Sequence, residues 1–204
     1  MNASMRRLAP AGALLALFTL AGCAGTGARF PGGAYEEGPR RDDKAFGESC
    51  PQVAPGTADA AALAESRALD AIRRTPQLSD FAALVKTAKA DDMFASMQNV
   101  TVFVPTDAAF EALPAERRKE LADPKAAGDT IRSLIVAQDL TKEDLGTGQS
   151  HPTLQEGVQL HTRAAAGGVT VDGAEVVCGS VTTSDARLHL LGALPGVGGR
   201  GPGG

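Results

Sequence analysis

The side chains that could act as catalysts or metal ligands are spread along the chain without the spacing that either role requires. The three histidines fall in different segments and show neither an HxxH-like nor an HExxH spacing, so a zinc site would depend on chance proximity in the fold. Two pairs of adjacent acidic residues are of the sort used by hydrolases, but such pairs usually mark the solvated start of a helix. No serine lies in a Gly-x-Ser-x-Gly turn, and no glycine-rich phosphate loop follows a strand-like segment. The sequence therefore predicts no catalytic residue and no metal site, the residues considered being His151, His161, His189, Asp91, Asp92, Glu143 and Asp144.

A cysteine near the N-terminus is a candidate for covalent modification. Arg6-Arg7 precedes the uncharged run Leu8–Leu20, and Ala21-Gly22-Cys23 follows it. A basic start, a short apolar run and a small-residue cleavage site are the parts of a signal peptide. The run is too short for a transmembrane helix, which needs roughly 20 residues. The segment is therefore predicted to be a signal peptide.

The four residues Leu20-Ala21-Gly22-Cys23 resemble the lipobox of bacterial lipoproteins. In that family the cysteine thiol receives a diacylglycerol, and the signal peptide is cut directly before it. The resemblance implies that Cys23 is lipidated and that the chain is held on the outer face of the membrane or is partly released from it. A diacyl thioether buries enough methylene groups, at about 0.8 kcal/mol each, for lasting attachment. The alternative is an ordinary signal peptide with an incidental cysteine, which predicts a secreted soluble protein.

The charge of the chain argues against two classes of partner. The chain carries 20 basic and 24 acidic residues, and removal of residues 1–22 deletes two arginines and no acidic residue. A negative domain does not attract nucleic acid. It also lacks the basic face that docks on anionic lipid, so we expect the anchor alone to contact the membrane.

Composition divides the chain into four parts. Residues 1–22 are the signal peptide, and residues 23–47 are rich in glycine, proline and charge, which predicts a flexible lipid-anchored linker. Residues 48–195 are long enough to form one folded domain. Residues 196–204 are a Gly/Pro tail with no apolar pattern.

The two halves of the domain have different patterns. The first half favours helices, among them residues 60–74 and a helix from Pro124 to about Gln138, with a strand at Val100–Val104. After His151 the pattern changes to short strands, with Asp172-Gly173 as the turn of a hairpin. Helices followed by antiparallel strands indicate an α+β fold.

Two segments of this domain resemble the conserved boxes of fasciclin (FAS1) domains. The first is Thr101-Val-Phe-Val-Pro-Thr-Asp-Ala-Ala-Phe-Glu-Ala-Leu-Pro114, and the second runs from Val171 to Leu191. The domain is similar in particular to single-domain fasciclin lipoproteins and secreted antigens of actinobacteria. The resemblance implies a β-wedge of two small sheets with several packed helices, no cofactor, and a role in cell-surface adhesion. Leu134-Ile135 stands where the family usually has a Tyr-His pair, and Gly192 stands in place of an acidic residue in the closing strand.

The two remaining cysteines, Cys50 and Cys178, are expected to pair. Export to an oxidising space favours disulfides, and the actinobacterial relatives carry one cysteine before the domain and one in the second box, which implies a Cys50–Cys178 disulfide. Closure of so long a loop stabilises by about 4 to 5 kcal/mol in the chain-entropy model. Two free buried thiols are the alternative.

Two functions from different classes remain open. One is an adhesion module that binds a surface protein or a glycan, as a monomer, and predicts an exposed apolar patch without a deep cavity. The other is an envelope lipoprotein that binds a small apolar or lipid ligand in the wedge, and predicts a pocket of several hundred cubic ångströms. For the first, Leu134, Ile135 and the loop Thr141–Pro152 form a candidate interaction surface, although Leu134 and Ile135 could instead complete the core.

Overall fold

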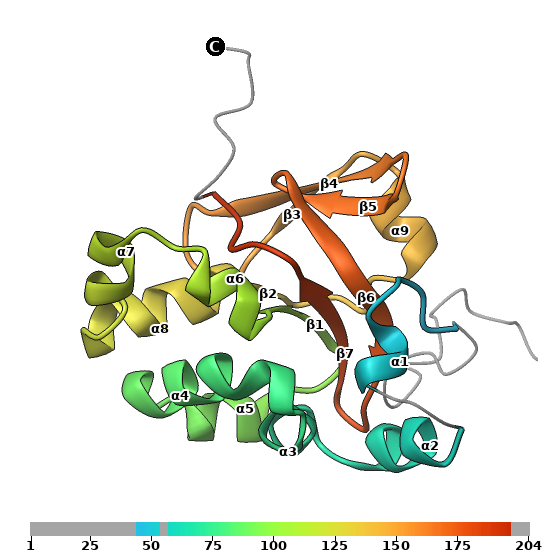
Figure 1. Cartoon of the computed structure of the whole chain (residues 1–204), viewed down its shortest axis with the longest axis horizontal. Coiled ribbons are helices and arrows are strands. Elements are labelled where there is room, and N and C mark those ends of the chain that lie inside the picture. The colour runs from blue at the N-terminus through green and yellow to red at the C-terminus, as the bar shows by residue number, and fades with distance from the viewer. Residues whose placement is uncertain (1–43, 54–56, 197–204) are drawn as a thin grey trace, which may run out of the picture. The chain divides into compact units, whose positions relative to one another are not determined.

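The computed structural model describes residues 44–53 and 57–196 (Figure 1). Contacts divide the chain into two units, Met1–Ala34 and Tyr35–Gly204, and every described residue belongs to the second unit. The predicted signal peptide, Cys23 and most of the predicted linker lie outside the described residues, as do residues 197–204 of the predicted tail.

Seven strands form a mixed sheet in the order β2-β1-β7-β6-β5-β4-β3. β1 and β7 are parallel, and the other neighbours are antiparallel. The strands are β1 (Val100–Pro105), β2 (Ile135–Val136), β3 (Ser150–Pro152), β4 (Gln159–Ala165), β5 (Gly168–Val171), β6 (Ala174–Thr182) and β7 (Ala186–Leu191).

The parallel pair of β1 and β7 forms the centre of the fold. Every residue of both strands is buried, and six residue pairs lie in register from Val100↔Ala186 to Pro105↔Leu191. Strands covered on both faces read as continuous apolar runs rather than as alternating patterns. The strand predicted at Val100–Val104 is therefore confirmed, and its burial explains its composition.

Strand β6 connects the two parts of the seven-stranded sheet, which correspond to the wedge expected from the sequence: β2-β1-β7 on one side and β5-β4-β3 on the other. It pairs with β5 at its start and with β7 over most of its length, and two register shifts bend it, one of them at Ser180 with φ 56°. An isolated bridge between Val136 and Thr153 connects β2 with the chain after β3, so the two ends of the strand order meet. The predicted α+β architecture is confirmed, with a sheet that nearly closes.

Helices cover the sheet on several sides (Figure 1). α4 packs on α8, α3 contacts β7, α1 and α2 lie against β6, and α9 lies against β4 and β5. The helices are α1 (Cys50–Val53), α2 (Thr57–Glu65), α3 (Ala68–Arg74), the 3-10 helix η1 (Pro76–Leu78), α4 (Ser79–Ala88), α5 (Asp91–Ser96), α6 (Asp107–Glu111), α7 (Ala115–Glu120), α8 (Pro124–Ser133) and α9 (Lys142–Gly146).

Two predicted helices are shorter than expected. The helix predicted over residues 60–74 breaks into α2 and α3, because Arg67 is extended and the carboxylate of Asp185 accepts the Ala68 N–H at 2.8 Å, which starts a new helix. The helix predicted to reach Gln138 ends at Ser133, because the next residues pair with β1 as strand β2. In both cases a contact distant in sequence outweighs local helix propensity.

The hairpin predicted at Asp172-Gly173 is confirmed. Both residues have positive φ, 45° and 85°, as a type I′ turn requires. The turn connects β5 to β6 and sets the register in which Val171 faces Ala174.

Candidate functional site

A short N-terminal strap, defined here as residues 44–50, runs along the edge of β6. The N–H of Phe46 donates to the carbonyl of Gly179 at 3.0 Å, and the N–H of Gly179 donates to the carbonyl of Phe46 at 2.7 Å. The N–H of Ser49 donates to the carbonyl of Val177 at 3.0 Å. Because β5 pairs only with the first two residues of β6, the strap covers part of the edge that β5 leaves open.

The strap corrects the predicted boundary between linker and domain. The sequence predicts a flexible linker through Gly47, yet Phe46 is already paired with β6. Its aromatic ring supplies apolar surface that the glycine, proline and charged residues around it lack. An aromatic residue four positions before Cys50 is the signal that could have revealed this contact.

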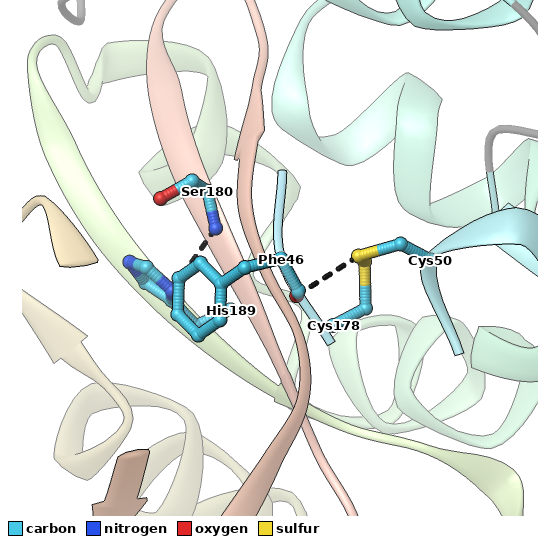
Figure 2. The surroundings of a disulfide bond; sticks show 5 residues. All are labelled: Phe46, Cys50, Cys178, Ser180 and His189. Atoms are coloured by element: carbon cyan, nitrogen blue, oxygen red, sulfur yellow. Dashed lines mark hydrogen bonds between the residues drawn. A yellow bond between two sulfur atoms is a disulfide. The ribbon is translucent and has the colours of Figure 1, made fainter. Parts of the chain in front are cut away.

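The ring of Phe46 lies in a notch made by a glycine. A Cβ at Gly179 would overlap the ring, so only glycine leaves room for it. Lys142 of α9 places its Nζ 4.8 Å from the ring centroid, within cation–π range. His189 of β7 lies 6.2 Å from it, ring to ring (Figure 2). Side chains from α9 and β7 and the backbone of β6 therefore anchor this one residue.

His189 is a buried core residue, and both of its ring nitrogens have backbone partners. The N–H of Ser180 donates to Nδ1 at 3.2 Å, and Nε2 lies 3.0 Å from the carbonyl of Leu140. Because a carbonyl only accepts, this pattern assigns the proton to Nε2. The ring is fully buried and stacks on Phe103 with centroids 5.5 Å apart.

Cys50 and Cys178 form a disulfide that closes the strap onto β6 (Figure 2). The two residues are 128 positions apart, and their Cα atoms are 4.8 Å apart. Cys178 is fully buried. The carbonyl oxygen of Phe46 lies 3.0 Å from the sulfur of Cys50, a close contact rather than a hydrogen bond because a disulfide sulfur carries no proton.

Two hollows border the strap, and both are open to solvent and mostly apolar. The larger, of about 440 Å³, lies where the strap, η1 and the start of α6 meet; its wall includes Val53, Pro76, Thr106, Val177, Leu190 and Gly192. The smaller, of about 330 Å³, lies between the strap, α2 and β6; its wall includes Lys44, Leu63, Ala64, Cys178 and Val181. Their sizes fall at the low end of the range for small-molecule sites.

A third hollow, of about 330 Å³, lies away from the strap between α4, α6 and α7, with Asp80, Glu111 and Arg118 in its wall. The pKa of Asp80 is raised, first by loss of solvation and then by the negative charges of Asp107 and Glu111. Asp107 accepts from the Ser79 hydroxyl at 2.7 Å and from the Asp80 N–H at 2.9 Å. The role of Asp107 is thus to cap the start of α4.

Leu134 and Ile135 do not form the surface proposed for them from the sequence. Leu134 is 1% exposed and Ile135 is fully buried, because the chain turns inward from α8 into β2 beside β1. The second interpretation, that the pair completes the core, is the one the structure supports. Large apolar side chains that are exposed lie instead at Leu154 and Val158, after β3.

The loop predicted at Thr141–Pro152 contains regular structure. Thr141 and Asp144 form a capping box that starts α9, and β3 follows. His151 of β3 is buried, with Nε2 3.2 Å from the Thr162 hydroxyl. Burial lowers the pKa of His151, and the charge of Asp144 opposes this shift.

The remaining polar residues considered for chemistry serve structure. His161 is exposed, with Nδ1 3.1 Å from the carboxylate of Asp172. Asp91 starts α5 and pairs with Arg73. Within residues 44–53 and 57–196, no three His, Cys, Asp or Glu side chains are grouped so that they could hold a metal ion.

Arg187 and Asp139 form a buried ion pair that no pattern in the sequence predicts. Arg187 of β7 is fully buried, and its Nε lies 2.6 Å from a carboxylate oxygen of Asp139. The position of Arg187 in the second fasciclin-like box does not indicate that it is buried, because its partner Asp139 lies 48 positions earlier in the chain. Such a pair, once buried, is costly to break.

None of the helices that the structure describes has the length and apolar character needed to cross a membrane.

Comparison with known proteins decides the family. The Fasciclin domain model matches residues 76–194, which is more than half of the chain. The chain belongs to the fasciclin family. The matched region of this fasciclin chain runs from η1 to Leu194 and so contains β1, β6 and β7.

Relatives of this fasciclin chain include mycobacterial surface proteins. It is 30% identical over 156 residues to the cell surface glycolipoprotein MPB83 of Mycobacterium bovis, a match that covers 72% of this chain and 69% of that protein. It is 33% identical over 93 residues to the immunogenic protein MPB70 of the same organism, covering 45% of this chain and 46% of that one.

A solved structure with a similar fold is the FAS1 domain pair of the insect cell adhesion molecule Fasciclin I. The TM-score is 0.55 at 18% sequence identity, and the match covers 64% of this chain and 51% of the insect chain. The chain thus spans about half of that structure, and the likeness concerns the fold.

Proposed function

We propose that this chain is a bacterial surface lipoprotein, anchored through Cys23 on the outer face of the membrane, whose fasciclin domain acts as a monomeric adhesion module for a surface protein or a glycan. The observation that carries most weight is the 30% identity with a cell surface glycolipoprotein over 72% of the chain. The Leu20-Ala21-Gly22-Cys23 segment and the Cys50–Cys178 disulfide support export. The insect protein with a similar fold is a cell adhesion molecule, which supports the adhesive role.

The anchor is tested by detergent phase partitioning and intact-mass measurement of protein made in an actinobacterial host. Wild type is expected in the detergent phase with added acyl mass on Cys23, whereas Cys23→Ala stays aqueous. Thr26→Ala, a change three residues after Cys23 that keeps the cysteine, serves as the matched control and should behave as wild type. An aqueous wild type without acyl mass would contradict the anchor.

The adhesive role is tested with beads that carry the chain without its signal peptide. Beads with the folded domain are expected to attach to bacterial envelopes or host cells at least several-fold better than beads with Leu134→Ala/Ile135→Ala, in which the core is disrupted. Equal attachment of the two kinds of bead would show that the folded domain contributes nothing.

The hollow of about 440 Å³ favours a second candidate function, the binding of a small apolar ligand. Ala108 of α6 lines this hollow, whereas Ala112, just after the same helix, does not. If a dansyl-labelled fatty acid binds there, Ala108→Leu should weaken it about tenfold, and Ala112→Leu should leave its affinity unchanged. Equal affinities, or no binding at all, would exclude this hollow as a ligand site.

A further inference from the structure

The disulfide connects the N-terminal end of the folded domain directly to the interior of its sheet. Cys50 is the first residue of α1, so all later helices follow it in sequence. Cys178 lies within β6, which pairs with β7, and β7 in turn pairs with β1 along six residues. A pull on the chain before residue 50 therefore reaches the central strands through one covalent bond and bypasses the 128 positions between the two cysteines.

Without the disulfide, the same pull would meet only non-covalent resistance before α3. The strap is held to β6 by the backbone hydrogen bonds of Phe46 and Ser49 and by the Phe46 ring in its notch at Gly179. Phe46 comes first along the chain, so its contacts are the first that a pull from the N-terminal side loads. The next element, α1, contains no buried residue.

The first strong resistance after α1 and α2 is at the start of α3. There Asp185 accepts the Ala68 N–H at 2.8 Å, and the Arg67 guanidinium lies 2.9 Å from the same carboxylate. The side chains of Ala68, Ala71 and Ile72 are buried. The segment from Cys50 to Ser66 is thus the part that a pull could peel away while the sheet stays folded.

We propose that the Cys50–Cys178 disulfide is a mechanical clip, which transfers tension from the N-terminal side into β6 and prevents α1 and α2 from being peeled off the domain. Its use on the cell rests on the proposed anchor at Cys23, since an anchored adhesion module is pulled from that side. The clip itself is a property of the purified chain, so its failure is distinguishable from failure of the anchor.

The test is to stretch single molecules of the chain from residue 24 onward between an N-terminal handle and a handle on an azide-bearing residue in place of Lys125. The Lys125 side chain is 84% exposed at the start of α8, so the handle leaves the core intact. The same folded molecule is pulled first oxidised and then after addition of a thiol reductant, which avoids relying on a variant that has to fold without its disulfide.

The oxidised molecule is expected to unfold without an early step. After reduction, a step at lower force should release the roughly 17 residues from Cys50 to Ser66, with an extension of up to about 60 Å. An early step of this size in the oxidised molecule, or its absence in the reduced one, would overturn the proposal.

A second pulling direction separates a clip from a general loss of stability, because reduction also destabilises the whole domain. Handles at position 125 and at the C-terminus do not load the strap. In this direction reduction should add no early step of about 60 Å. If the same step appears in both directions, the disulfide acts only on global stability and the clip is refuted.

Discussion

The carboxylate of Asp185, just before β7, accepts a hydrogen bond from the backbone N–H of Ala68, 117 positions earlier in the chain. The same carboxylate pairs with Arg67 and accepts from the Thr183 hydroxyl at 3.2 Å, and the residue is 3% exposed. One side chain thus starts α3 and fixes that helix to the sheet.

Replacement of Asp185 by alanine is expected to destabilise the domain by about 2 kcal/mol, because it removes a helix cap and leaves the Ala68 N–H buried without its acceptor. Urea unfolding measures this loss. Asp70→Ala, an exposed change in the first turn of the same helix, should cost under about 0.5 kcal/mol. Similar losses for the two variants would contradict the capping role.

Leu134→Ala and Ile135→Ala should each cost about 2 to 5 kcal/mol in free energy of unfolding, because each opens a cavity in the core. Leu154→Ala, at a side chain that is 37% exposed, should cost far less. Denaturant titrations of the three variants give the comparison. A Leu134 variant as stable as the Leu154 variant would make Leu134 a candidate surface contact again.

Gly179→Ala should displace Phe46 from its notch, because the added Cβ overlaps the ring. We expect a loss of about 1 to 3 kcal/mol. In the Phe46→Ala background, where no ring is left to overlap, the same glycine change should cost much less. Gly146→Ala, in α9, meets no atom within 4 Å and serves as the control. Strictly additive effects of the two changes would show that the ring and the glycine do not interact.

Stability should fall below neutral pH in part through His151. Burial lowers the pKa of the folded-state imidazole, so the unfolded chain takes up a proton near pH 6.5 while the folded chain does not. The free energy of unfolding therefore decreases as the pH falls from about 6.5 to the lowered pKa of the folded state, and then levels off with respect to this group. Unfolding titrations of His151→Gln should show a shallower decrease than wild type.

The exposed His161 provides the control for this pH effect. His161→Gln is the matched substitution at a histidine whose side chain is 70% exposed. If both substitutions change the profile equally, the pH dependence comes from elsewhere.

A local pattern predicts the structure correctly where its backbone preference agrees with the fold. The apolar run Val100–Val104 became the buried strand β1, and Asp172-Gly173 became the turn before β6, because in each the backbone preference matches the final environment. The two boxes sufficed to give the family and hence the fold.

A local pattern does not predict the structure where a partner distant in sequence decides the conformation. Arg67 is extended rather than helical because Asp185 caps the helix that starts at Ala68. Ile135 adopts a strand conformation because it pairs with Val102 of β1. Phe46 falls in the predicted linker because its partner is Gly179. A glycine has no side chain that could indicate such a contact in the sequence. None of these pairings produces a periodicity that can be read along the chain.

The parallel pairing of β1 with β7 also sets the order of events during synthesis. Five other strands lie between β1 and β7 in sequence, and β7 is the last strand that the structure describes. Until residues 186–191 have emerged, β1 lacks the neighbour that pairs with all six of its residues. Burial of the central strands therefore waits until β7 has been synthesised, and a chain truncated before Ala186 should remain unfolded however much of the helical half it contains.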